Sequence, residues 1–435
     1  MSRSIYFMLC IVIILFQSCK KEKDEQYPQA TWEFPSEFEI YHVFDTIRFS
    51  IQVSDESKLE SAVIDISNEN FSRVLPAIEI NSFPSNSAQI AREIVIDEIH
   101  LPSGNYYIRV RLSDGENETV EFRACTIVEE PLEIKKIIAF RNNGTSTRID
   151  TLGIDENNWS FAAESGFESE VFSINSWHQE TVLAHQSEGQ LAWLDVESMN
   201  PFANQNIPSP DGFQFWRDFY FDEERLIYVG TTEDGYIRTF RPGGNAALNI
   251  VVNNGFRAEK VQIIGNYLLA ELQSIDLNTH LLSVYNYNTG VFLQSMNIGF
   301  DIVEIIKVNE DEALIFGNDN GNGIIKPYII SANNTEFALN INLAEINSAI
   351  HNDFGYYIVA EENELRSFFY DGNGNFTVLG ISVPGDYTGL VHEKVSGAFL
   401  ALFNDQIQYF DNNLNLVNTL VTPSGTERFG ILYNK

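Results

Sequence analysis

Residues 255–300 read GFRAEKVQIIGNYLLAELQSIDLNTHLLSVYNYNTGVFLQSMNIGF, and this stretch decides the fold. It begins with a glycine–aromatic pair, Gly255-Phe256, and ends on a second pair, Gly299-Phe300. Between the pairs lie three short apolar stretches, 260–264, 268–272 and 281–287. The turn-forming residues Asn288-Thr289-Gly290 then lead into a fourth. The stretch therefore predicts four short β-strands joined by tight turns.

The glycine–aromatic mark recurs at a nearly constant spacing through the rest of the chain. It stands at Gly166-Phe167, Gly212-Phe213, Gly255-Phe256, Gly299-Phe300, Gly385-Asp386-Tyr387 and Arg428-Phe429. Its aromatic residues are separated by 46, 43, 44, 87 and 42 residues, and the value of 87 is two periods with one mark lost near 344–347. A period near 43 with four strands in each repeat is typical of a β-propeller.

The ends of this region predict how the ring closes. Each blade needs four strands. Seven strands can be placed as the first strand of a blade, but only six sets of the other three strands follow them. The missing set stands at the front, at 135–140, 147–152 and 159–162. We therefore expect an all-β chain with a seven-bladed propeller over residues 132–435, in which strand 429–433 completes the first blade. Such closure pairs the strand edge of the first blade that would otherwise be exposed.

Residues 31–131 predict a separate β-sandwich of about seven short strands. Strands of alternating apolar residues are interrupted by turns such as Asp114-Gly115, and Pro131 marks the boundary. The stretch Pro102-Ser103-Gly104-Asn105-Tyr106, followed by alternating apolar residues, resembles the late strands of PKD-like, immunoglobulin-type modules.

The start of the chain resembles the export signal of a bacterial lipoprotein. Arg3 precedes an apolar run, 5–16, that is too short to span a bilayer. Leu15-Phe16-Gln17-Ser18-Cys19 is similar to the lipoprotein cleavage box, although Phe16 departs from the usual leucine. The resemblance implies a signal peptide over 1–18, a lipidated Cys19 and a charged tether over 19–30. It also implies a place in the outer membrane, facing the cell exterior. The alternative is an ordinary secretory signal with a coincidental cysteine.

Charge and cysteine content narrow the possible partners. The net charge is −34, and by count residues 28–133 hold 7 basic and 20 acidic groups while 134–435 hold 16 and 38. A surface this acidic repels phosphate backbones and anionic lipid, so we expect no nucleic-acid partner, and membrane attachment through the lipid alone. Cys125 is the one cysteine beyond Cys19, and we expect a buried structural thiol.

Aromatic and charged residues near the marks are the candidate ligand-binding residues. In a propeller the loops that precede each first strand share one face with the loops between the second and third strands, and this face commonly binds ligands. Its candidates are Phe213, Trp216, Arg217, Phe256, Arg257, Phe300, Asp301, Asp386, Tyr387, Arg428 and Phe429. The rings could stack on sugars while the charged groups bind hydroxyls. The alternative is that the phased rings only pack between blades. Trp216 departs from the phase, which makes it the better ligand candidate.

No motif in the chain predicts a catalytic residue, a metal or a cofactor. The loop Asp371–Asn375 has alternating oxygen ligands but lacks the glycine and the acid that a calcium loop needs, so we expect a hairpin turn. The histidines at 178, 185, 280, 351 and 392 lie in different repeats and share no ligand spacing.

The order of signal, PKD-like module and propeller resembles surface lipoproteins that accompany the glycan-uptake systems of Gram-negative gut bacteria. This resemblance implies a non-catalytic protein that captures a glycan or docks a protein partner. One alternative is a polysaccharide lyase or hydrolase, and another is a scaffold for an outer-membrane transporter. Three or more His, Arg and acidic groups converging in one pocket would favour catalysis, and an exposed row of aromatic rings would favour capture.

Overall fold

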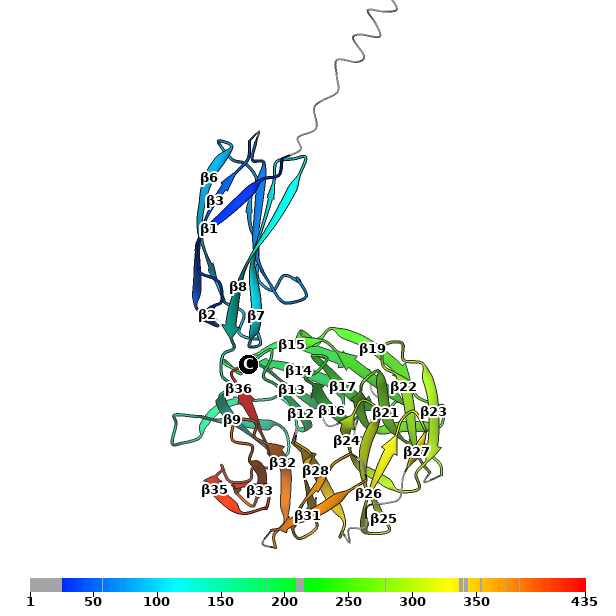
Figure 1. The fold of residues 1–435 in the computed structure, drawn as a ribbon. Helices are drawn as coiled ribbons and strands as arrows, with labels where there is room; N and C mark the ends of the chain where they lie inside the picture. The colour runs from blue at the N-terminus through cyan, green and yellow to red at the C-terminus, as the bar shows by residue number, and fades with distance from the viewer. Residues whose placement is uncertain are drawn as a thin grey trace, which may run out of the picture. The chain divides into compact units, whose positions relative to one another are not determined.

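The computed structural model describes residues 26–56, 58–185, 187–208, 215–277, 279–335, 339, 343–352, 354–372, 374–382 and 384–435 (Figure 1). The predicted signal peptide, Cys19 and Phe213 lie outside these residues. The chain divides into two compact units, Met1–Pro131 and Leu132–Lys435. The described residues contain no helix with the length and apolarity that a bilayer crossing requires.

The N-terminal unit is built from two β-sheets. One has the order β1 (Gln29–Phe34), β3 (Thr46–Ser54), β6 (Ser87–Val95). The other has the order β2 (Glu39–His42), β8 (Glu118–Val128), β7 (Gly104–Ser113), β4 (Ser61–Ser67), β5 (Ile78–Ile80). Alternation along each strand turns one row of apolar side chains inward, for example Phe49 and Ile51 from β3 and Ile108 from β7, and both sheets share one core. The unit is therefore a two-sheet sandwich.

Cys125 lies in the core of this unit, on β8. Its side chain is free and buried, as expected, and burial raises the pKa of its thiol to about 11. The thiolate is therefore scarce at neutral pH, which fits a structural residue and not a nucleophile.

The C-terminal unit contains, among its described residues, seven four-stranded antiparallel sheets, which are the blades of a propeller. The first four are β36 (Arg428–Tyr433), β9 (Ile134–Asn142), β10 (Thr147–Gly153), β11 (Ser160–Glu164); β12 (Ser169–Asn175), β13 (Glu180–His185), β14 (Gly189–Asp195), β15 (Pro201–Ile207); β16 (Trp216–Asp222), β17 (Ile227–Thr232), β18 (Tyr236–Phe240), β19 (Ala246–Val251); and β20 (Phe256–Ile264), β21 (Tyr267–Ser274), β22 (His280–Asn286), β23 (Phe292–Asn297). A short 3-10 helix, η1 (Pro242–Gly244), precedes β19.

The other three blades follow in chain order. They are β24 (Asp301–Asn309), β25 (Glu312–Asp319), β26 (Asn322–Ile329), β27 (Asn334–Thr335); β28 (Ile346–His351), β29 (Tyr356–Glu361), β30 (Leu365–Tyr370), β31 (Phe376–Ile381); and β32 (Tyr387–His392), β33 (Phe399–Phe403), β34 (Gln406–Phe410), β35 (Leu416–Val421). The shortest outer strand, β27, belongs to the repeat that precedes the missing mark.

The C-terminal strand closes the ring as the sequence predicts. β36 pairs antiparallel with β9, from Arg428 opposite Phe140 to Tyr433 opposite Ile134 (Figure 1). Tyr433 is also held by its neighbours: its backbone N–H donates to the Ser176 hydroxyl at 3.0 Å, and its carbonyl accepts from Gln179 at 2.8 Å. The first blade is thus built from both ends of the unit.

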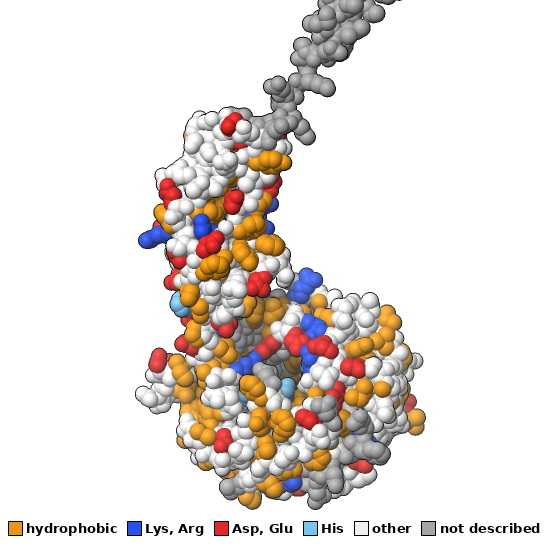
Figure 2. All heavy atoms as spheres, viewed as in Figure 1, with side chains coloured by type: hydrophobic (Ala, Val, Ile, Leu, Met, Phe, Trp, Pro, Cys, Tyr) orange, Lys and Arg blue, Asp and Glu red, His pale blue; other side chains and the backbone are white. Residues whose placement is uncertain are grey.

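Acidic side chains are scattered over both units on the face drawn in Figure 2. This distribution agrees with the sequence count, in which acids outnumber bases in each part. It describes a solvated acidic exterior.

Candidate functional site

The aromatic platform that we expected is wrong for four of its rings. Trp216, Phe300, Tyr387 and Phe429 have exposed fractions of 1%, 5%, 3% and 3%, so they offer no face to a ligand. Phe256 is half-buried and packs against the apolar core between two blades. The phased rings therefore serve the packing that we gave as the alternative, and Trp216 is not the exception.

Glycines explain why the rings are buried. A Cβ atom on Gly230 of β17 would lie 2.8 Å from the Trp216 ring, and one on Gly317 of β25 would lie 2.5 Å from the Phe300 ring. In both blades the aromatic residue before or at the start of the first strand rests on a glycine of the second strand. The missing side chain makes the space that the ring fills.

The charged candidates are only partly brought together. Arg217 and Arg257 start the first strands of adjacent blades and share the Glu233 carboxylate. Asp301 begins the first strand of the next blade. Asp386 and Tyr387 lie at β32 and Arg428 on β36, in other blades, so they do not belong to this group.

Arg217 and Arg257 are the centre of a hydrogen-bonded network. Arg217 donates to Glu233 through Nε at 2.8 Å, and Arg257 donates to the other oxygen of Glu233 at 3.1 Å. Arg257 also donates to Glu259 at 2.5 Å and to Gln273 at 2.6 Å. Burial lowers the pKa of Arg257, but the carboxylates of Glu259 and Glu233 outweigh this, and the pKa lies above its ordinary value. The network is internally paired and about one-fifth exposed.

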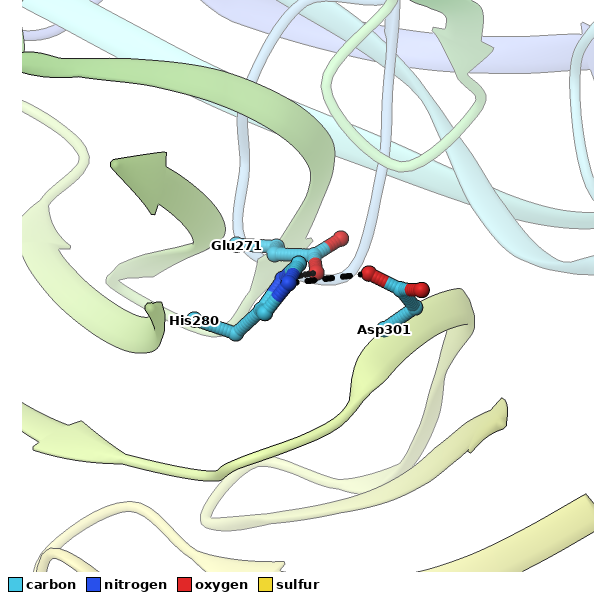
Figure 3. A group of neighbouring side chains, drawn as sticks. All are labelled: Glu271, His280 and Asp301. Atoms are coloured by element: carbon cyan, nitrogen blue, oxygen red, sulfur yellow. Dashed lines mark hydrogen bonds and ion pairs between the residues drawn. The ribbon is translucent and has the colours of Figure 1, made fainter. Parts of the chain in front are cut away.

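Three donor groups that the sequence did not connect meet beside this network: Glu271, His280 and Asp301 (Figure 3). His280 stands opposite Gln273 in the β21–β22 pairing, so strand register places the imidazole next to the arginine network. Nδ1 of His280 lies 2.8 Å from Glu271 Oε1, and Nε2 lies 2.9 Å from Asp301 Oδ1. Glu271 and His280 are buried, whereas the side chain of Asp301 is 68% exposed.

The pKa shifts of this group follow from its burial and its bonds. Burial raises the pKa of Glu271, although hydrogen bonds from His280 and from the Ile302 backbone N–H oppose the shift. The hydrogen bond to Glu271 raises the pKa of His280, against the effect of burial. A buried imidazole between two carboxylates can hold a proton or, in principle, a metal ion.

A second charged group lines the channel on the innermost strands of three consecutive blades. Lys260 on β20 lies 3.7 Å from Asp218 on β16, and Glu304 is on β24. The charge of Asp218 raises the pKa of Lys260. Burial raises the pKa of Glu304 to about 7, even though the Lys260 charge opposes this shift.

A hollow of about 670 Å³ opens at the far ends of these inner strands, away from the marks. Its walls come from four consecutive blades and from the turns after β16, β28 and β30. They are formed by Tyr220, Phe221, Asp222, Glu223, Glu224, Gln262, Ile263, Lys307, Val308, His351, Asn352, Phe354, Gly355, Tyr357, Phe369, Tyr370 and Asp371. The volume falls in the range of small-ligand sites. This hollow is therefore at the opposite end of the channel from the face that we singled out.

Both aromatic and charged groups line this hollow. Phe354, in the turn after β28, is 76% exposed. Lys307 bridges Glu224 and Glu310, each at 2.7 Å, and its hydrogen bond lowers the pKa of Glu224. The imidazole of His351 stacks on the Tyr357 ring with centroids 5.8 Å apart.

Comparisons with known proteins show a similarity of fold and no similarity of sequence family. No protein-family model matches the chain, and no curated protein matches its sequence. A protein of unknown function from Desulfotomaculum acetoxidans is 13% identical, with a TM-score of 0.52 over 68% of this chain and 99% of its own. A Lactobacillus plantarum protein is 12% identical, with a TM-score of 0.52 over 69% and 100%. The propeller of Dos1 is 10% identical, with a TM-score of 0.49 over 68% and 88%. At such identities the likeness is one of fold alone.

Proposed function

We propose that this chain is a non-catalytic binding protein that captures a glycan in the hollow at the end of its propeller channel. In this proposal the leader directs export, Cys19 carries the lipid that anchors the chain in the outer membrane, and the N-terminal unit is an immunoglobulin-type spacer. The cleavage-box pattern around Cys19 and the acidic exterior support the proposed export and cell-surface location. The propeller fold is consistent with a binding or scaffold role.

The observation that carries the proposal is the composition of the hollow. One strongly exposed ring, Phe354, stands among polar groups with both donors and acceptors, such as Asn352 and Lys307. Sugar rings offer apolar faces that stack on aromatic side chains and hydroxyls that bind amides, carboxylates and ammonium groups. A concave site with one stacking face and several polar groups suits such a ligand.

The test is retention of polysaccharides by the purified chain, followed by calorimetric titration of those that are retained. We expect Phe354→Ala to weaken binding about tenfold, since loss of one aromatic contact removes on the order of 1.4 kcal/mol. The matched control is Phe202→Ala, because Phe202 is 53% exposed on the outer strand β15, away from the hollow. Equal weakening by both substitutions would contradict this location. Retention of no polysaccharide would shift the proposal to a protein partner.

A second candidate is cleavage of the bound polysaccharide at the same hollow. The observation that favours it is that His351 and the acids Glu223, Glu224 and Asp371 all line the cavity, which meets the criterion for catalysis that we gave from the sequence. Several of these groups already have structural tasks, since Asp371 accepts from Asn375 and Glu224 pairs with Lys307. Prolonged incubation with a retained polysaccharide separates the two candidates. A binding protein leaves the polymer length unchanged, whereas a hydrolase or lyase releases new reducing ends.

A further inference from the structure

We propose that Glu271, His280 and Asp301 form a binding site for one divalent transition-metal cation of the Zn²⁺ or Mn²⁺ type. The three residues come from β21, β22 and β24 and meet at the opposite end of the channel from the hollow (Figure 3). Each offers one donor atom, and these atoms all lie within 4.8 Å of one another. The cation site is independent of the glycan proposed above.

The distances fit an ion with a small closure. A point equidistant from three atoms 4.8 Å apart lies about 2.8 Å from each, and metal–ligand bonds to nitrogen and oxygen are about 2.0–2.2 Å long. The carboxylate that must move inward is that of Asp301, whose side chain is 68% exposed at the first residue of β24. His280 contacts a different carboxylate through each ring nitrogen, so a bound ion replaces one of these two contacts. The open side of the site leaves room for water to complete the coordination.

Within the part of the chain that the structure describes, the Glu271 carboxylate is hydrogen-bonded through only one of its two oxygens. Both described hydrogen bonds to the Glu271 carboxylate, from His280 and from the Ile302 N–H, end on Oε1. Among the described residues no group donates to Oε2, and this oxygen is not one of the fully buried side-chain atoms, so water can reach it. Glu271 therefore keeps one oxygen that no described hydrogen bond occupies, and this oxygen is open to a ligand.

The local charge favours a divalent cation. The site and the adjoining network contain two guanidinium groups, Arg217 and Arg257, which pair with Glu233 and Glu259. The negative charges of Glu271 and Asp301 remain, and the two positive charges of one divalent ion would balance them. One imidazole with two carboxylates suits Zn²⁺ or Mn²⁺ better than Ca²⁺, which prefers oxygen alone.

Calorimetric titration of the metal-free chain with Zn²⁺ alone, and separately with Mn²⁺ and Ca²⁺, tests the site. We expect one saturable site for Zn²⁺ or Mn²⁺ that Asp301→Asn weakens at least tenfold and His280→Gln abolishes. Asp301 is exposed, so its substitution does not disturb the core and keeps the test meaningful if His280→Gln fails to fold. The control is His42→Gln, because His42 forms an exposed pair with Asp45 at 3.6 Å and should leave binding unchanged.

Three results would overturn the proposal. One is the absence of saturable binding. Another is several weak sites that Asp301→Asn leaves unaltered, as expected for ions adsorbed on an acidic surface. The third is tighter binding of Ca²⁺ than of Zn²⁺ and Mn²⁺.

Discussion

Replacing Gly230 by alanine tests whether the aromatic rings near the marks belong to the core. The new Cβ would lie 2.7 Å from the Phe219 ring and 2.8 Å from the Trp216 ring, whereas carbon atoms prefer about 3.5–4.0 Å. The rings cannot easily retreat, because Trp216 and Phe219 pack edge to face at 5.5 Å and Phe219 stacks on Tyr228 at 5.6 Å. The substitution therefore overpacks a filled core.

Overpacking of this kind costs about 2–3 kcal/mol of unfolding free energy. At roughly 2–4 °C per kcal/mol, we expect the propeller transition in a calorimetric scan to fall by about 4–12 °C. Gly166→Ala is the control, because no atom lies within 4 Å of its Cβ position. In open space a glycine-to-alanine change is neutral or stabilising by about 0.4–1 kcal/mol. If Gly230→Ala proves as stable as Gly166→Ala, the packing account of Trp216 fails, and its place as a ligand candidate returns.

Three further predictions concern closure, pH and the thiol. Removing residues 428–435 leaves the edge of β9 unpaired. We therefore expect loss of the cooperative thermal transition and a shift to aggregates in size-exclusion chromatography. A monomer of unchanged stability would contradict the role of β36. Because the pKa of Glu304 is raised to about 7, the folded chain keeps a proton that the unfolded chain loses at lower pH. Stability from this group is full below the ordinary pKa of glutamate and falls as the pH rises toward 7, by at most about 1.4 kcal/mol per pH unit. Glu304→Gln should flatten that slope in urea titrations, and an unchanged slope would refute the assignment. Cys125 should react with a thiol reagent only after unfolding, and rapid modification of the native chain would show that it is not buried.

The repeat carries most of what the sequence could predict. A constant period places the first strand of each blade, and the mismatch between seven first strands and six complete sets predicts the pairing of β36 with β9. Both inferences depend on spacing along the chain. Neither inference depends on which side chain occupies a given position.

The ends of the strands explain what the sequence analysis missed. In the fourth blade we predicted strands over 260–264, 268–272 and 281–287, but the structure has β20 from Phe256, β21 to Ser274 and β22 from His280. The extensions include the polar residues Arg257, Glu259, Gln273 and His280. Register across the extended strands aligns Arg257, Gln273 and His280 in one row. Longer strand predictions would have exposed that row, whereas its contact with Asp301 depends on how two blades pack.

The hollow shows a different limit of sequence reasoning. Its walls come from strand ends in four blades and from turns in two of them, and a turn gives no periodic signal of its own. Phe354 follows no mark, and nothing near it in the sequence separates an exposed ring from a buried one. Only the curvature of the closed ring brings it to the cavity.

The feature that identifies the fold also directs attention to the wrong residues for function. A residue that recurs at the same phase of every blade meets the same neighbours seven times, so its common task is packing between strands and blades. A ligand in the channel meets all the blades at once, and it can be held specifically only by groups that differ from blade to blade. Phe300 on Gly317 belongs to the first class, and Asp301, one residue later, belongs to the second. For a closed ring of repeats, a departure from the period is a guide to a site only where the side chain is also exposed, as the buried Trp216 shows. Asp301 at one end of the channel and Phe354 at the other meet both conditions, and our two proposals rest on them.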